Sequence, residues 1–228
     1  TPLYSSAASD VYKRQVWRRL AEVVMGSPFD LHAERYDAWF DSPQGSAIFA
    51  AELESIRALK RAAGGRWLEV GVGTGRFAER LGVDEGVDPS EEMLRRARAR
   101  GITVRAATAE ALPYPDSSWD GLLLVVTICF LDDPRLALAE CMRVLKDGGE
   151  LIVGLVPADS PWGAEYSRQG RQGHPFYSAA RFYTCDEVID LAGQAGLVYD
   201  GAASTLLEPP ADDPPSAMQE PVEGMVQG

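Results

Sequence analysis

The sequence is short of cysteine, and what cysteine it has is scattered. Cys129, Cys141 and Cys185 form no C-x-x-C pair. That spacing argues against a disulfide framework and against a zinc site, and it favours a reducing compartment. We therefore expect a cytoplasmic protein without a metal centre.

Positive charge and long apolar runs are also scarce. The 228 residues carry 22 Lys and Arg against 34 Asp and Glu, a net charge of -12. Such a field repels phosphate backbones, so nucleic acid is not an expected partner. The longest apolar run, LLLVVTICF at residues 122–130, is far shorter than the roughly 20 residues of a membrane-spanning helix. We expect no membrane partner, and we interpret this run as a buried parallel strand.

The two ends differ from the rest of the sequence. Residues 10–15 (DVYKRQ) can be encoded by a transposase end sequence used in preparing DNA libraries. We predict that residues 1–24 derive from adaptor and leader DNA, and we exclude them from fold reasoning. Residues 208–228 are rich in proline and acid. We predict that they are the truncated C-terminal segment of a metagenomic fragment.

Between the ends, short apolar runs alternate with helical patterns. Two helices come first, at residues 29–41 and 46–63. The expected strands are residues 67–70, 83–87, 102–106, 120–127, 151–156 and 197–207, and the expected helices between them are residues 75–81, 90–100, 134–145 and 186–195. This alternation predicts an α/β protein with a doubly wound, mostly parallel sheet and helices on both faces. Residues 157–183 are too long for an ordinary connection, so we interpret them as a lid over a substrate.

A glycine-rich turn follows the first predicted strand. Residues 68–77 read LEVGVGTGRF, and glycines in such a turn let backbone amides approach a ligand closely. The turn alone is a weak signal, because many strand-to-helix turns contain glycine. A dinucleotide-binding G-x-G-x-x-G motif would need its third glycine where Arg76 stands.

An acidic residue ends the second predicted strand. Asp88 lies within GVDPSEEML at residues 86–94, where a carboxylate can accept hydrogen bonds from both hydroxyls of a ribose. The alternative is an acid that stabilises the start of the next helix. Because Ser90 already suits that helix as its cap, we favour the ribose interpretation.

Two further motifs complete a family pattern. They are ATAEALPYPDSSWD at residues 107–120 and RVLKDGGELIV at residues 143–153. With them the chain resembles class I methyltransferases that use S-adenosylmethionine (SAM), over about residues 29–207. It is similar in particular to uncharacterised bacterial and archaeal members that share TICFLDDP (residues 127–134) and FYSAARFYT (residues 176–184).

The resemblance implies a fold and an activity. The fold would be a Rossmann-like domain at residues 25–207 with an N-terminal helical cap. The activity would be transfer of the SAM methyl group to a small-molecule acceptor, leaving S-adenosylhomocysteine (SAH), by a monomer or homodimer. The family sheet usually ends in an antiparallel strand. Because the chain stops soon after EPVEG at residues 220–224, we predict that this strand is missing.

The resemblance also implies roles for individual residues near the cofactor. The methionine part would be held by Glu69, Gly71, Gly73 and Gly75, and the ribose by Asp88. The adenine would lie beside Pro89 or Ser90, with its ring against Thr108, Ala109 and Glu110. The sulfonium would lie near Thr127. Two positions depart from the family pattern. Glu69 stands where aspartate is usual, and Thr108 stands where an acid usually accepts from the adenine amino group.

The chemistry requires no particular catalytic residue. Methyl transfer is an in-line displacement that depends mainly on alignment, and a base is needed only if the acceptor loses a proton. The candidate acceptor contacts are Tyr36, Asp37, His174, Tyr177 and Arg181, of which His174, Tyr36 and Tyr177 are also candidates for proton transfer. The competing interpretations are core packing for Tyr36, a structural role for His174 and an ion pair for Arg181. Two other functions remain open, an NAD(P)-dependent oxidoreductase and a SAM-binding module without catalysis.

Overall fold

The computed structural model describes residues 27–61, 64–210 and 222–225. The predictions for residues 1–24 and 211–221 lie outside the described residues. The described part opens with α2 (Pro28–Leu31), α3 (Ala33–Trp39) and α4 (Pro43–Leu59). The single helix expected at residues 29–41 is in fact two, because His32 leaves helical geometry with φ −123° and ψ 18°. Serine side chains cap α2 and α4.

A five-stranded parallel sheet forms the centre of the fold. Its strands are β1 (Trp67–Val70), β2 (Glu85–Asp88), β3 (Thr103–Ala106), β4 (Trp119–Val125) and β5 (Leu145–Gly154). They lie in the order β3-β2-β1-β4-β5, and all neighbours are parallel. The strand order reverses at β1, and ligands of doubly wound sheets bind beyond the carboxyl ends of the strands at such a point. The predicted α/β class and parallel sheet are confirmed.

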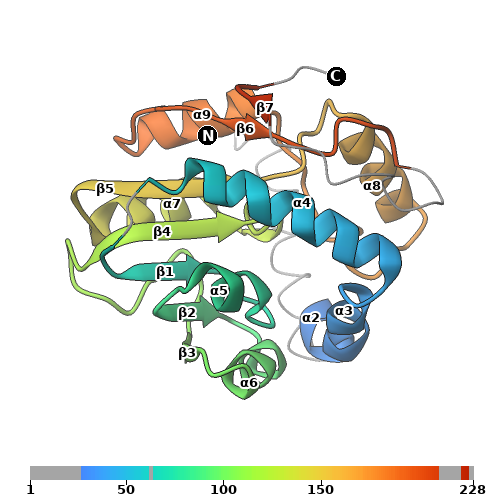
Figure 1. The fold of residues 1–228 in the computed structure, drawn as a ribbon, viewed down its shortest axis with the longest axis horizontal. Helices are drawn as coiled ribbons and strands as arrows, with labels where there is room; N and C mark the ends of the chain where they lie inside the picture. The colour runs from blue at the N-terminus through green and yellow to red at the C-terminus, as the bar shows by residue number, and fades with distance from the viewer. Residues whose placement is uncertain (1–26, 62–63, 211–221, 226–228) are drawn as a thin grey trace, which may run out of the picture.

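Helices cover both faces of this sheet. The remaining helices are α5 (Arg76–Leu81), α6 (Glu91–Ala99), the 3-10 helix η1 (Ile128–Phe130), α7 (Pro134–Val144), α8 (Pro161–Arg171) and α9 (Cys185–Gln194). One buried cluster joins the sheet to α4, α5 and α6, and the other joins it to α7 and α9. The helices α2, α3 and α8 gather at the end of the sheet toward which the strand arrows point (Figure 1).

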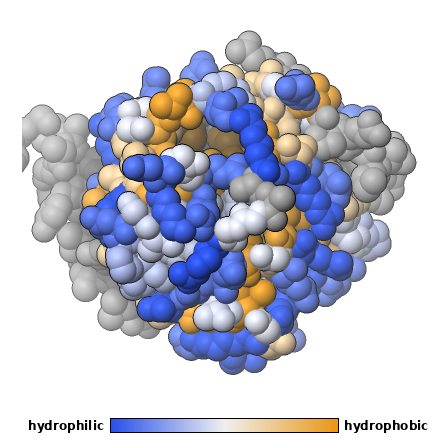
Figure 2. Space-filling model, turned by 60° about the vertical axis from the view of Figure 1, so that its left-hand side comes forward, coloured by the Kyte–Doolittle hydropathy of each residue, from blue (hydrophilic) through white to orange (hydrophobic). Residues whose placement is uncertain are grey.

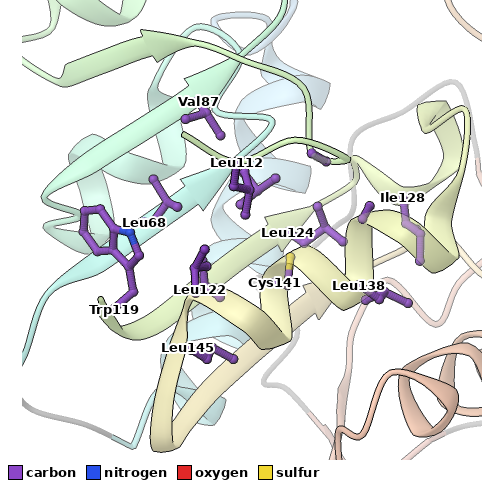
Figure 3. Packing of buried hydrophobic residues seen from close by; sticks show 14 of the residues in the cluster. Leu68, Val87, Leu112, Trp119, Leu122, Leu124, Ile128, Leu138, Cys141 and Leu145 are labelled. Atoms are coloured by element: carbon purple, nitrogen blue, oxygen red, sulfur yellow. The ribbon is translucent and has the colours of Figure 1, made fainter. Parts of the chain in front are cut away.

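The run LLLV of β4 is at the centre of the core. Leu122, Leu123 and Leu124 are completely buried, because β4 is covered on both faces and lies between β1 and β5. On the side of α7, Leu122 and Leu124 pack with Leu138 and Cys141 (Figure 3). This packing explains why the strand is apolar without alternation.

The C-terminal part of the sheet departs from expectation. β5 begins at Leu145 rather than residue 151, and its pairing with β4 shifts register between Trp119 and Gly121. The strand expected at residues 197–207 is wrong in extent. Only β6 (Ala203–Ser204) forms, and it pairs antiparallel with β7 (Val222–Glu223) in a separate sheet. Within the described residues, the outer edge of β5 therefore faces a groove of about 1090 Å³ instead of another strand.

The segment at residues 157–183 contains the helix α8, which the sequence pattern did not predict. Ser160 caps it by accepting from the backbone N–H of Gly163. No helix in the described ranges combines the length and apolar character needed to cross a bilayer. On the face shown in Figure 2, hydrophilic residues predominate, and hydrophobic residues are exposed in patches and in a hollow.

Candidate cofactor and acceptor site

The glycine turn after β1 has the backbone geometry that glycine permits. Gly71, Gly73 and Gly75 all have positive φ, at 76°, 52° and 83°, a region that other residues rarely adopt. A Cβ at Gly71 would lie 2.4 Å from the side chain of Thr127, whereas a Cβ at Gly73 would meet nothing within 4 Å. The turn is therefore open at Gly73, whereas at Gly71 it packs closely against Thr127, just after the end of β4.

Asp88 joins the two motifs that the sequence separates. Its Oδ2 accepts from the backbone N–H of Gly73 and its Oδ1 from that of Ser90, both at 2.9 Å. Burial raises the pKa of Asp88 to about 6, although these two amide hydrogen bonds act in the opposite direction. A buried carboxylate thus lies directly beside the glycine turn.

Glu69 supplies a second buried carboxyl group. Its side chain is 2% exposed, and Oε2 has no hydrogen-bond partner in the described structure. Burial raises the pKa of Glu69 to about 8, with a further contribution from Asp88. Buried acids in proteins are normally paired, so this orphaned oxygen fits a ligand that brings a hydrogen-bond donor or a positive charge.

The residues expected near the adenine and the sulfonium have varied surroundings. Thr127 Oγ1 donates to the carbonyl of Val125 at 3.1 Å. Ala109 is buried, and Pro89 and Thr108 are exposed. Glu110 has a different contact, since its Oε1 accepts from the backbone N–H groups of Asp132 and Asp133. The Glu110 carboxylate therefore orders the loop before α7.

The carboxylate of Asp37 is shared by two arginines. Arg76 Nε donates to its Oδ1 at 2.7 Å, and Arg100 Nη2 donates to its Oδ2 at 2.9 Å. Burial acts to raise the pKa of Asp37, but these hydrogen bonds outweigh it and lower the pKa to about 2. Arg76, noticed in the sequence only as a missing glycine, thus ties α3 to the helix that follows the glycine turn.

Aromatic rings from α2, α3 and residues 174–182 meet at the same end of the sheet. The Tyr36 ring lies 5.6 Å from that of Phe176 and 6.1 Å from that of Phe29. Tyr177 stacks between His174 and Tyr166, with centroids 4.3 Å apart on each side. The pKa of Tyr36 is raised by burial and then by four groups, Glu52, Asp88, Glu69 and Tyr177. Tyr36 therefore lies within electrostatic range both of the two acids near the glycine turn and of Glu52 on α4.

The other two acceptor candidates differ in position. His174 Nδ1 accepts from the backbone N–H of Tyr177 at 3.4 Å, and burial, together with Arg35, lowers the pKa of its imidazole. Arg181 is exposed, with its guanidinium 4.7 Å from the centroid of Tyr183. The structure thus brings Tyr36, His174 and Tyr177 into one aromatic group and places Arg181 at its outside.

Sequence reasoning missed two residues near this aromatic group, Tyr166 and Glu52. Tyr166 lies on α8, where no helix was predicted. Glu52 lies on α4, four residues from both Ile48 and Ile56, which are buried. An acid at that spacing is on the apolar face of its helix, and this signal was available in the sequence.

Comparison with known proteins agrees with this geometry. A family described as methyltransferase domain matches residues 68–153. An uncharacterised protein of Mycobacterium tuberculosis is 42% identical over 178 residues, which are 78% of this chain and 62% of that protein. An uncharacterised protein of Methanocaldococcus jannaschii is 38% identical over 180 residues, 79% of this chain and 85% of that protein. The chain thus spans under two thirds of the length of the mycobacterial relative.

A solved structure covers more of the chain. It is a Thermotoga maritima protein described as a SAM-dependent methyltransferase, possible histamine N-methyltransferase. Its crystal structure superposes with a TM-score of 0.80 at 40% identity, covering 88% of this chain and 93% of that one. With this identity over nearly the whole of that protein, the chain belongs to the family of SAM-dependent methyltransferases.

Proposed function

We propose that this protein transfers the methyl group of SAM to a small-molecule acceptor. One observation supports the proposal above the others: the Asp88 carboxylate accepts from the amide of Gly73 and interacts electrostatically with Glu69, whose Oε2 has no hydrogen-bond partner in the described structure. Two acids and an open glycine turn at the carboxyl ends of β1 and β2 suit a cationic nucleoside. Oxidoreductase function lacks this support, because the family match is to methyltransferases.

The assignment of cofactor contacts follows from these groups. Glu69 would hold the amino group of the methionine part, and Asp88 would accept from the ribose hydroxyls. The backbone of Gly71, Gly73 and Gly75 would allow close approach. Around the adenine we assign Pro89 and the backbone of Thr108, Ala109 and Glu110, and we assign Thr127 to the region of the sulfonium. When bound, SAM supplies a methyl group activated by the positive sulfur.

The protein's own contribution is alignment and exclusion of water. Tyr36 interacts electrostatically with both cofactor acids and with Tyr177, so α3 connects the two halves of the site. Asp37 holds this helix in place through Arg76 and Arg100. Because that carboxylate is already shared by two guanidinium groups, we assign it to positioning α3 and not to acceptor binding.

The acceptor side would use Tyr36, Tyr177 and His174, with Arg181 at its rim. The lowered pKa of His174 keeps its imidazole neutral at pH 7, which suits a proton acceptor. We further propose a cytoplasmic location, with which the three free thiols agree, and a monomer or homodimer.

An acceptor screen with methyl-labelled SAM tests the function. We expect label in a small-molecule product and SAH released in equal amount. Binding of SAM without turnover across amines, phenols, thiols and carboxylic acids would favour a binding module instead. Preferential binding of NADH or NADPH over SAH would contradict the proposal.

A further inference from the structure

Glu52 is a partly buried acidic residue on α4. Burial alone raises its pKa to about 7. No hydrogen bond or ion pair joins Glu52 to another residue within 27–61, 64–210 and 222–225. The other acidic side chain of this turn, Glu54, is half exposed and paired with Arg57. A helix loses stability by burying an unpaired acid, so Glu52 calls for a functional explanation.

Three phenols lie close enough to the Glu52 carboxyl to interact with it electrostatically. Tyr36 of α3, Tyr166 of α8 and Tyr177 of the following loop each interact electrostatically with it, and the pKa of each phenol is raised by burial and further by this acid. Tyr166 and Tyr177 are stacked, with ring centroids 4.3 Å apart. Phenols from α3, α8 and the following loop therefore lie near this one acid of α4.

This cluster is continuous with the proposed methyl-transfer site. Tyr36 interacts electrostatically with Glu69 and Asp88 and also with Glu52 and Tyr177. Tyr177 in turn interacts with Cys129, two residues beyond Thr127. Glu52 also lines the groove that includes Val126 and Pro157. A ligand held by Glu52 would thus lie near both the aromatic rings and the carboxyl groups of Glu69 and Asp88.

The charges around this space favour a cation. The groups that interact with Glu52 from α3, α8 and the loop are phenols, and Glu69, Asp88 and Glu165 interact electrostatically with the same phenols. None of these groups carries positive charge. Buried carboxylates are stabilised by a hydrogen-bonded cation, and aromatic faces attract cations as well. An anionic acceptor would be repelled by the same groups.

We propose that Glu52, with the phenols of Tyr36, Tyr166 and Tyr177, selects the acceptor, and that the acceptor is a small molecule with a protonated amino group. This inference rests on the proposed function and names the substrate class of that same site. Glu52 is then a specificity-determining residue.

Calorimetry on the SAH complex tests the inference. The probes are phenethylamine, a cation at neutral pH, its neutral analogue 2-phenylethanol, and its anionic analogue 3-phenylpropanoate. We expect phenethylamine to bind more tightly than either analogue. In Glu52→Gln, its affinity should fall about 10- to 100-fold, as for loss of a hydrogen bond to a charged group. Glu54→Gln, a matched change on the exposed side of α4, should bind all three probes like the wild type.

A proton measurement separates recognition from a merely structural role. Because burial raises the pKa of Glu52 to about 7, its carboxyl group is mostly protonated at pH 6. A bound cation would favour the carboxylate, so phenethylamine should release up to about one proton at pH 6, and little at pH 8.5. Calorimetry in buffers of different ionisation enthalpy measures this release, which Glu52→Gln should abolish.

Two results would overturn the inference. One is equal or weaker binding of phenethylamine compared with 2-phenylethanol, and the other is unchanged phenethylamine binding in Glu52→Gln. If the wild type failed to bind SAH at the outset, the proposed function itself would fail. Intact SAH binding with no preference for the cation would contradict the substrate class alone.

Discussion

The cofactor half and the acceptor half of the site are formed by different kinds of groups. On the cofactor side, backbone amides and two buried acids lie at the ends of adjacent strands, within residues 69–90. On the acceptor side, side chains of α2, α3, α4 and α8 meet across long sequence separations. The first half depends on strand register and glycine geometry, whereas the second depends on how helices pack. Substitutions in the two halves should therefore differ in their effects on stability, SAH binding and methyl transfer.

Crowding the glycine turn should give the largest effect. Gly71→Ala places a Cβ 2.4 Å from the Thr127 side chain at φ 76°. Backbone strain alone costs about 1–3 kcal/mol, and the overlap adds to it. We expect a fall in Tm of more than about 5 °C and loss of SAH binding. Gly73→Ala is the matched control, because its φ is also positive but its Cβ would be unobstructed. Equal effects of the two changes would contradict the close-contact explanation.

Removing the ionisable group of Glu69 should change stability and SAH binding in opposite directions. Its folded pKa of about 8 exceeds the ordinary value of 4.5, so the folded state holds an extra proton between these pH values. Its contribution to stability is present below pH 4.5 and is lost as the pH rises through 8. We expect Glu69→Gln to raise the Tm of the cofactor-free protein at pH 8.5 and to weaken SAH binding about tenfold or more. A lower Tm with unchanged binding would show that Glu69 is structural.

Breaking the Asp37 ion pairs should act on the N-terminal helices. The side chain of Asp37 is 15% exposed, and that of Asp41, which also pairs with Arg76, is 69% exposed. We expect Asp37→Asn to cost about 1–3 kcal/mol in denaturant unfolding. Asp41→Asn should cost less than about 1 kcal/mol. Because the folded pKa of Asp37 is about 2, its contribution is present above the ordinary value and is lost as the pH falls toward 2. A larger effect of Asp41→Asn would contradict this assignment.

The smallest effect is expected at His174. NMR titration should give an imidazole pKa below 6.5, because burial and Arg35 disfavour the charged ring. His174→Gln should slow methyl transfer only about two- to fivefold if alignment dominates the chemistry. A loss nearer to 100-fold, with SAH binding intact, would instead identify His174 as a necessary base.

The same contrast explains what could be predicted from the sequence. The glycine turn, Asp88 and the parallel strands are local patterns, and the structure joins Asp88 to Gly73. The acceptor side is not local. The spacing of Glu52 from Ile48 and Ile56 puts it on the apolar face of its helix but does not say what it meets there. Tyr166 lay where no helix was predicted. Their meeting depends on how α4 and α8 pack, which no periodicity reveals. The expected strand at residues 197–207 failed for a similar reason, because a strand needs a partner that the described residues do not place there.

The most direct test of the account is calorimetric titration of SAH into the wild-type protein and into Asp88→Asn at pH 7.5. The account predicts measurable binding by the wild type, a loss of about 10- to 100-fold in the variant, and weakening of wild-type binding as the pH falls below the Asp88 pKa of about 6. A folded wild type without affinity for SAH, or an Asp88→Asn variant that binds as tightly, would contradict it.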